Sequence, residues 1–188
     1  MNFASRSKWK SPAVLRPRRL PAGVRGWLLD RGSLTARLQT RCPARFRVEL
    51  LHQGRERPRI DESRLLGIPS GCHALVREVR LYCGHDAWVF ARTVIPLASL
   101  RGRNRRLGSL GERPLGAFLF AHPGLRRGRF ELGCLRPGDP LFRRALGGET
   151  AVEGIDAVWG RRSVFWLHGQ PLLVAEFFLP DLLRAWPR

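Results

Sequence analysis

The chain has 188 residues, about one domain's length, which suffices for a single hydrophobic core. A hydrophobic content of 44% excludes a chain that is disordered throughout, and no apolar run approaches the ~20 residues of a membrane-spanning helix, so no stable membrane insertion is expected. The net charge of +19 favours an anionic partner, whether nucleic acid, an acidic membrane surface or a small anion, although arginines on a solvated surface would explain it equally well.

The first residues read as a basic extension ahead of the folded domain. Residues 1–24 are basic and lack the apolar core of a signal peptide, so we expect a flexible N-terminal arm there and one domain over residues 25–184. Helical patterning follows. Ser33 is placed to cap a second short helix, in which Leu34 and Leu38 share one face because they lie four residues apart.

Alternating residues then predict the first strands. Phe46, Val48 and Leu50 alternate with charged residues, as in a half-buried strand. Residues 57–71 read as a loop or a short helix closed by Gly and Pro. Residues 73–96 contain two β-rich runs on either side of Cys-Gly-His-Asp, which predicts a hairpin.

The second half of the chain follows a similar plan. Residues 112–124 predict a short helix, residues 127–136 a strand, and residues 136–154 a loop with about one helical turn. Residues 158–180 predict a second hairpin that turns at Leu-His-Gly-Gln. Strands in adjacent hairpins, with helices at the start and in the middle, predict an α+β fold with a single antiparallel β-sheet and covering helices, rather than a doubly wound fold.

Strand alternation singles out Arg77. Side chains alternate between the two faces of a strand, so Arg77 shares its face with three aliphatic residues of the run 75–82. Glu78 and Arg80 take the opposite and wetter face. Arg77 is therefore expected to point inward and Arg80 outward.

Glu176 is a lone carboxylate in an apolar run. It shares a face with Val174 and Phe178, and the opposite face is apolar too, which indicates a central strand covered on both sides. An unpaired buried ion costs several kcal/mol. Two interpretations remain open: a buried Arg77–Glu176 salt bridge without a further role, or a closed pocket with one fixed cation and one carboxylate.

Three other arginines interrupt apolar strands. Arg92 faces the same way as its apolar neighbours, whereas Arg161 and Arg162 point to opposite faces, so at most one of that pair is expected to point inward. Snorkelling of each side chain to the surface is the simpler explanation.

Several motifs together resemble the chorismate pyruvate-lyase family. They span residues 27–180 in the family's order and read WLLDRGSLTARL, LVREVRLY, FARTVIP, RPLGAFLF, WGRRSVF and PLLVAEFFLP. The resemblance implies conversion of chorismate to 4-hydroxybenzoate and pyruvate, the first committed step of ubiquinone biosynthesis, without a metal or organic cofactor. It also implies a chorismate lyase-like fold, in which helices on a single antiparallel sheet cover a buried ligand site.

The resemblance assigns roles to four residues. Arg77 corresponds to the arginine that holds the aromatic carboxylate, and Glu176 to the glutamate at the hydroxyl end of the ring. Leu34 and Leu115 correspond to residues that line the ligand. We expect Arg77 and Glu176 in one enclosed cavity, on neighbouring strands. Residues 136–157 exceed the length of the shortest family members and would alter a rim or lid.

The chemistry suits these residue types. Chorismate is a dianion with a ring carboxylate and an enolpyruvyl ether, and an arginine fork binds a carboxylate bidentately without losing its charge. Loss of the C4 hydrogen and the C3 enolpyruvyl group makes the ring aromatic, so positioning and modest proton transfer suffice for catalysis. Glu176 would act as a base toward C4–H or exchange a proton with the hydroxyl or the leaving enol. Elimination within the substrate, in a merely shaped and charged pocket, is the alternative.

Two other functions compete with the lyase. The same type of fold serves as the effector-sensing domain of some transcription regulators, which would make this a non-catalytic small-molecule binding domain. The second alternative is a basic module that binds nucleic acid, which would need exposed aromatic residues among its basic ones. The best candidate segment, residues 101–106, contains no aromatic residue and is expected to be a solvated loop. We therefore expect chorismate and 4-hydroxybenzoate as small-molecule partners, no nucleic acid, and a monomer.

The four cysteines are scattered. Cys42, Cys72, Cys83 and Cys134 form no C-x-x-C pair, and no histidine lies at zinc-finger spacing from them, so no metal site is expected. Nothing in their spacing suggests a disulfide framework. Single cysteines are typical of a reducing compartment, which favours a cytoplasmic location.

Overall fold

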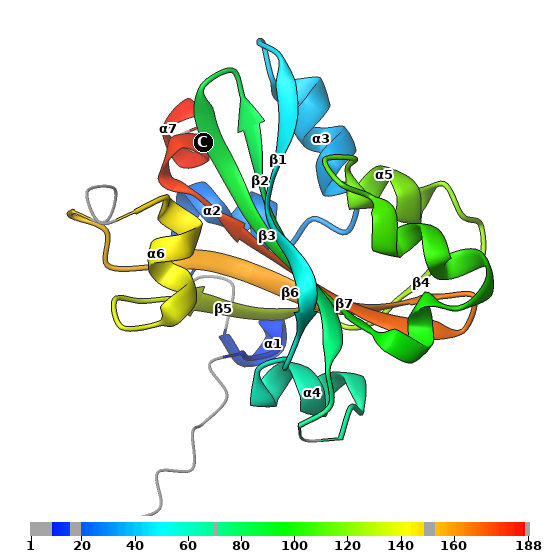
Figure 1. The fold of residues 1–188 in the computed structure, drawn as a ribbon. Helices are drawn as coiled ribbons and strands as arrows, with labels where there is room; N and C mark the ends of the chain where they lie inside the picture. The colour runs from blue at the N-terminus through cyan, green and yellow to red at the C-terminus, as the bar shows by residue number, and fades with distance from the viewer. Residues whose placement is uncertain (1–8, 16–19, 70, 149–152, 187–188) are drawn as a thin grey trace, which may run out of the picture.

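The strands form one antiparallel sheet. The computed structural model describes residues 9–15, 20–69, 71–148 and 153–186. Among these residues, seven strands form the sheet. Six follow the order β1-β2-β3-β7-β6-β4, and the seventh, β5, pairs with another stretch of β6 (Figure 1). The strands are β1 Phe46–Glu56, β2 Ala74–Cys83, β3 Asp86–Pro96, β4 Arg126–Arg127, β5 Glu131–Leu135, β6 Val158–Leu167 and β7 Gln170–Phe178. The predicted α+β class with a single antiparallel sheet is confirmed.

Short helices surround this sheet. The α-helices are α1 Pro12–Leu15, α2 Ala22–Leu28, α3 Leu34–Arg41, α4 Ile60–Leu66, α5 Leu115–Phe120, α6 Pro140–Leu146 and α7 Pro180–Ala185. Two 3₁₀ helices, η2 Leu97–Leu100 and η3 Gly102–Ser109, follow β3. The expected solvated loop at residues 101–106 is thus part of a 3₁₀ helix. Within the described ranges, no helix has both the length and the apolar composition that crossing a bilayer would take.

Both predicted hairpins are present. β2 pairs with β3, and β6 with β7, in antiparallel register. The second hairpin turns at His168 and Gly169, whose φ angles are +50° and +75°. Two successive positive φ values are typical of a type I′ turn, whose twist matches that of the flanking strands.

The helix caps explain where α3 and α6 begin. Ser33 caps α3 as predicted, since its hydroxyl accepts a hydrogen bond from the backbone N–H of Ala36. The expectation of about one helical turn after residue 136 underestimated α6, which has seven residues. Asp139 caps its first turn, and Gly147, with φ +103°, ends it in the left-handed conformation that glycine adopts readily.

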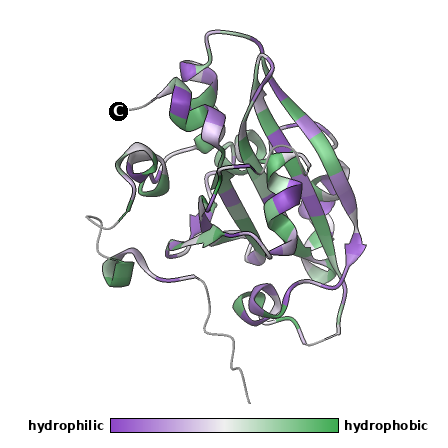
Figure 2. Ribbon diagram, turned by 90° about the vertical axis from the view of Figure 1, so that its left-hand side faces the viewer, coloured by the Kyte–Doolittle hydropathy of each residue, from purple (hydrophilic) through white to green (hydrophobic). Residues whose placement is uncertain are grey.

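Helices cover both faces of the sheet. On one face, α3 and α5 pack against residues such as Val79 and Val174. On the other, α4 and α6 pack against residues such as Val76 and Phe177. β7 therefore lies in the middle of the sheet with both faces covered, as predicted. Figure 2 shows hydrophilic stretches, in purple, that interrupt otherwise hydrophobic strands, in green.

A disulfide corrects the cysteine analysis. Cys42, at the end of α3, is bonded to Cys83, at the end of β2, with 5.5 Å between their Cα atoms. The expectation of no disulfide was wrong because 41 residues separate the two cysteines in sequence and only the fold brings them together. Cys72 and Cys134 are free.

The described part of the N-terminal segment contacts the sheet. The backbone of Lys10 exchanges two hydrogen bonds with that of Leu132, and the ring of Trp9 lies 5.7 Å from that of Phe177. Residues 1–8 and 16–19 lie outside the described residues. The division into an arm at residues 1–24 and a domain at residues 25–184 remains a prediction.

Candidate functional site

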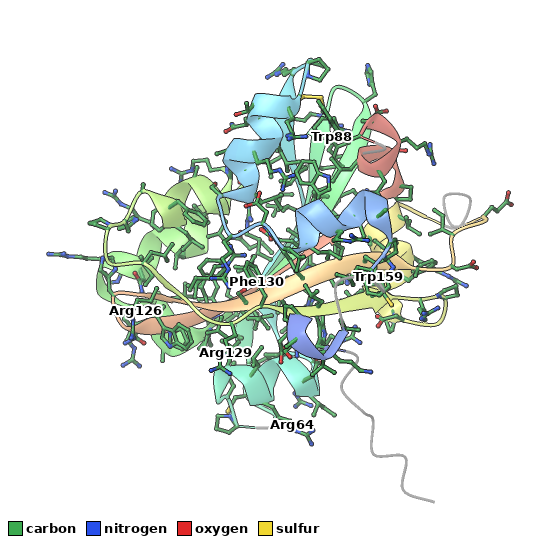
Figure 3. All side chains as sticks on the ribbon, turned by 180° about the vertical axis from the view of Figure 1, so that it is seen from behind. Arg64, Trp88, Arg126, Arg129, Phe130 and Trp159 are labelled. Carbon is green, nitrogen blue, oxygen red and sulfur yellow. A yellow bond between two sulfur atoms is a disulfide. The ribbon has the colours of Figure 1, made fainter. Side chains whose placement is uncertain are left out.

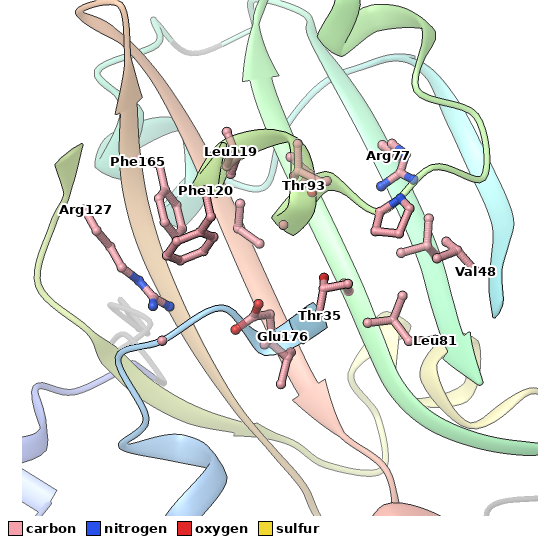
Figure 4. Close-up of a pocket in the computed structure, with 18 residues that line it drawn as sticks. Thr35, Val48, Arg77, Leu81, Thr93, Leu119, Phe120, Arg127, Phe165 and Glu176 are labelled. Carbon is pink, nitrogen blue, oxygen red and sulfur yellow. The ribbon is translucent and has the colours of Figure 1, made fainter. Parts of the chain in front are cut away.

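A pocket lies between the sheet and the helices α3 and α5 (Figure 4). It encloses a cavity of about 50 Å³, which is room for a few water molecules, so a larger ligand requires its walls to move outward. Its lining consists of Gly32, Leu34, Thr35, Val48, Arg77, Val79, Leu81, Ala91, Thr93, Pro114, Leu115, Gly116, Leu119, Phe120, Arg127, Phe165, Val174 and Glu176. All four residues singled out from the sequence, Leu34, Arg77, Leu115 and Glu176, therefore line one cavity.

Arg77 is a buried cation without an anion. Its side chain is on the face predicted by strand alternation, and the residue is only 2% exposed. One terminal nitrogen donates to the carbonyl oxygens of Gly111 and Arg113 at 2.8 and 3.0 Å. Its Nε has no hydrogen-bond partner, and no carboxylate lies within ion-pair distance, among the described residues. Burial lowers the pKa of the guanidinium to about 10, so it keeps its charge at neutral pH.

Glu176 has a partner, but the partner is not Arg77. Its Oε2 accepts a 2.6 Å hydrogen bond from Nε of Arg161, the residue directly opposite on β6. The interpretation as a buried Arg77–Glu176 salt bridge is wrong, and so is the expectation of neighbouring strands, because β3 separates β2 from β7. Arg161 is itself fixed by the carbonyl oxygens of Trp27 and Asp30. It holds Glu176 in place at the wall of the pocket.

The apolar walls come from the first residues of two helices. Leu34 begins α3 and Leu115 begins α5, and both are nearly buried. The two helices approach closely here, since a Cβ added at Gly116 would lie 2.6 Å from Oγ1 of Thr35. The arrangement forms an apolar slot with a cation and a carboxylate on its walls, which suits a flat acid with a second polar group.

Arg127 is the functional candidate that the sequence analysis missed. It lies on the two-residue strand β4 and lines the pocket with Arg77 and Glu176. Burial lowers its pKa to about 10, although the negative charge of Glu176 acts in the opposite direction. Arg127 begins the strand expected at residues 127–136, and no pattern in the sequence distinguished it from its arginine neighbours.

The opposite face of the sheet carries a network of paired charges. Arg92 is 5% exposed and donates to the carboxylates of Glu62 and Glu78. Burial alone would lower its pKa, but the two carboxylates outweigh burial and raise it. Glu78 is fully buried, and Arg80 donates to the carbonyl oxygens at the end of α6. The expectation of a wetter face for Glu78 and Arg80 was wrong because α6 covers it, and Arg92 does not snorkel.

The arginine pair on β6 also differs from expectation. Arg161 and Arg162 do point to opposite faces, yet both are buried because both faces are covered. Arg162 pairs with Glu131 and Asp61. A hollow of about 830 Å³ lies on this second face, but the buried arginines that line it, Arg92 and Arg162, already have carboxylate partners. The pocket of Arg77 is therefore the better candidate for an anionic ligand.

Comparison with known proteins identifies relatives over nearly the whole chain. The chorismate lyase family model matches residues 3–186. A protein of Methylococcus capsulatus named probable chorismate pyruvate-lyase is 46% identical over 162 residues, which are 86% of this chain and 98% of that protein. One of Nitrosospira multiformis with the same name is 41% identical over 185 residues, 98% of this chain and 99% of that protein.

Solved structures of similar fold belong to transcription regulators. The effector domain of PhnF from Mycobacterium smegmatis has a TM-score of 0.56 at 16% identity and covers 81% of this chain and 91% of that domain. The ligand-binding domain of a GntR-family regulator from Bordetella bronchiseptica has a TM-score of 0.51 at 18% identity, with 73% of this chain and 86% of that one covered. At these identities the likeness concerns the fold alone, and it agrees with the predicted chorismate lyase-like class.

Proposed function

The chain belongs to the chorismate lyase family, and we propose that its pocket converts chorismate to 4-hydroxybenzoate and pyruvate, the first committed step of ubiquinone biosynthesis. The observation that carries this proposal is Arg77. A buried guanidinium with an unused Nε and no carboxylate partner among the described residues is costly for the fold, and a ligand carboxylate would supply the missing anion.

Once the walls of the small cavity have moved outward, the substrate binds with its ring carboxylate at Arg77. The guanidinium fork forms two hydrogen bonds to that carboxylate, which fixes the plane of the ring. Leu34 and Leu115 then line the ring, and their apolar side chains exclude water from it. The C4 hydroxyl is directed toward Glu176.

The reaction breaks two bonds of the ring substituents. The C3–O bond to the enolpyruvyl group and the C4–H bond are lost, the ring becomes aromatic, and the enol takes up a proton to give pyruvate. Glu176 receives the C4 proton or passes one to the leaving enol, while Arg161 keeps its carboxylate in place. Binding in the correct orientation supplies the rest of the rate enhancement.

The proposed reaction also bears on the partners, the oligomeric state and the location of the protein. The chemistry requires small-molecule partners only, with no cofactor and no nucleic acid, because aromatisation of the ring drives it. We propose that the protein is a monomer. We propose a cytoplasmic location because substrate and product are small water-soluble anions. The disulfide between Cys42 and Cys83 removes the argument from single cysteines.

One assay tests the proposal. The purified full chain is incubated with chorismate, 4-hydroxybenzoate is followed by its absorbance, and pyruvate is measured separately with lactate dehydrogenase. We expect both products in equal amounts, with an unchanged rate in the presence of EDTA. The alternative, a non-catalytic effector-binding domain, predicts binding of 4-hydroxybenzoate without product formation from chorismate, and that result would reject the lyase.

A further inference from the structure

Chorismate carries two carboxylates, and Arg77 accounts for only one of them. The second lies on the enolpyruvyl group, which leaves with the pyruvate. The pocket contains one other arginine, Arg127. Resting on the function proposed above, we propose that Arg127 binds the enolpyruvyl carboxylate and thereby positions the leaving group of the reaction.

Arg127 is available for such a contact. Among the described residues it has no ion-pair partner, because the nearby carboxylates are already paired: Glu176 with Arg161, and Asp30 with Arg37. Within the part of the chain that the structure describes, its side chain donates hydrogen bonds only to the hydroxyl of Ser163, at 3.4 Å, and to the carbonyl oxygen of Arg31, at 3.1 Å. Its charge is therefore not required as the counter-ion of a protein carboxylate.

Aromatic rings fix the position of the guanidinium. Its central carbon lies 4.0 Å from the centre of the Phe130 ring and 4.8 Å from that of Phe165. Stacking on two rings limits the rotation of a long side chain, so less conformational entropy is lost when a carboxylate binds. Phe165 also lines the pocket, so the guanidinium is held at the wall and not in open solvent.

The location of Arg127 agrees with the shape of the substrate. In chorismate the ring carboxylate is at C1, the hydroxyl at C4 and the enolpyruvyl ether at the adjacent C3. A ring anchored by Arg77 with its C4 hydroxyl at Glu176 therefore directs the C3 group to the Glu176 end of the pocket. Figure 4 shows Arg127 entering from the side opposite to Arg77, with Glu176 between them in that view. The charge of Glu176 also acts on Arg127.

The test compares two neighbouring arginines. Arg127→Met keeps an unbranched side chain against the phenylalanine rings and removes the charge. Arg126→Met is the matched control, since Arg126 precedes it on β4, is exposed and faces Trp166. For each variant, kcat/KM for chorismate, the Kd for 4-hydroxybenzoate and the melting temperature are measured. 4-Hydroxybenzoate has the ring carboxylate but lacks the enolpyruvyl one.

We expect Arg127→Met to impair the use of chorismate but not the binding of 4-hydroxybenzoate. Arg127→Met should lower kcat/KM for chorismate by about 30-fold or more, as expected for loss of a charged partner from a buried carboxylate. Its Kd for 4-hydroxybenzoate should stay within about threefold of wild type, whereas Arg77→Met should weaken both ligands. Arg127→Lys, which keeps the charge, should recover part of the lost kcat/KM.

Two results would overturn the assignment. The first is a kcat/KM of Arg127→Met equal to that of Arg126→Met, and the second is an equal loss of chorismate and 4-hydroxybenzoate affinity. If Arg127→Met does not fold, Arg127→Gln, which preserves a polar group toward Ser163, replaces it with the same criteria. An inactive wild-type chain would instead reject the proposed lyase function, so the two failures are distinguishable.

Discussion

Arg77 and Glu176 are charges of opposite sign on the walls of one pocket, yet their surroundings differ. Glu176 is neutralised by Arg161 on the adjacent strand, whereas Arg77 is held only by backbone carbonyl oxygens. A buried ion whose partner is absent from the protein is expected where a ligand supplies that partner. We infer that Arg77 is charged in order to bind a ligand, whereas the charge of Glu176 is held in position by Arg161.

Arg77→Met should weaken ligand binding without loss of stability. Removal of the guanidinium should weaken 4-hydroxybenzoate binding by about 2–5 kcal/mol. Because the cation is buried without an anion among the described residues, its replacement by an apolar side chain should leave the free energy of unfolding unchanged or raise it by up to about 2 kcal/mol. Isothermal titration and urea unfolding measure the two quantities.

The matched control for this variant is Arg92→Met. Arg92 is also buried but has two carboxylate partners. Its removal would leave Glu62 without this buried cation and Glu78 with Arg144 alone, so the variant should lose about 3–5 kcal/mol of stability. Arg80, expected from the sequence to be a surface control, is unsuitable because it donates to α6. A loss of stability in Arg77→Met as large as that in Arg92→Met would show that Arg77 is structural.

Glu176→Gln tests proton transfer. Gln keeps the size of the side chain and an oxygen that accepts from Arg161, but it removes the basicity. Turnover per folded molecule should fall by about 10²–10⁴, while 4-hydroxybenzoate still binds. Stability should fall by about 1–3 kcal/mol because Arg161 loses its carboxylate.

Glu131→Gln is the control for this pair. It makes the same change in the partner of Arg162, on the other face of the sheet. Its turnover should match that of wild type. Near-normal turnover in Glu176→Gln would remove the proton-transfer role and leave a lyase that acts by positioning.

At the scale of elements, β6 and β7 can lie together only because one residue lacks a side chain. A Cβ added at Gly160 of β6 would lie 2.4 Å from the ring of Phe177 and 2.7 Å from the carbonyl oxygen of Glu176. The glycine therefore leaves room for the ring of Phe177, which follows Glu176 on β7. In β4, by contrast, a strand of only two residues is enough to hold Arg127 beside β6.

Gly160→Ala should be destabilising through overpacking. The added methyl group must displace Phe177 or the β7 backbone, which typically costs about 1–3 kcal/mol. Gly108→Ala is the control, because a Cβ there meets no atom within 4 Å. The midpoint of urea unfolding should fall in the first variant alone. Equal midpoints for the two variants would contradict the close contact.

At the scale of the whole molecule, the charge of +19 does not concentrate at the candidate site. Side chains that end in nitrogen project from several sides of the molecule in Figure 3. Many arginines also have protein partners, among them Arg59, Arg92, Arg161 and Arg162. This distribution favours a solvated basic surface around a small anionic site over a groove that binds nucleic acid.

The chain should bind DNA only weakly and without sequence preference. Its surface charge attracts any polyanion at low salt, and such binding weakens steeply as salt competes for the phosphates. At physiological salt the Kd for duplex DNA should be weaker than about 1 µM and equal for unrelated sequences. Fluorescence anisotropy with two labelled duplexes measures it. A preference for one duplex that persists at that salt would favour a nucleic-acid partner.

The turns, the helix cap and the direction of one side chain could be predicted from the sequence alone. The hairpins at residues 73–96 and 158–180, the cap at Ser33 and the inward side of Arg77 follow from alternation and turn chemistry, which act between residues close in sequence. The motifs that resemble chorismate lyases identified the family, which the comparisons show. Sequence alternation also predicted that β7 is covered on both faces.

The contacts between residues far apart in sequence became known from the tertiary structure alone. The strand order places β3 between Arg77 and Glu176, gives Glu176 to Arg161, and joins Cys42 to Cys83. Glu78 is buried and Arg80 half-buried because α6, far along the chain, covers them. Each of these outcomes depends on contacts between residues distant in sequence, whose pairing no local periodicity encodes. The same reason explains why Arg127, which no pattern distinguished from its arginine neighbours, emerged only with the pocket.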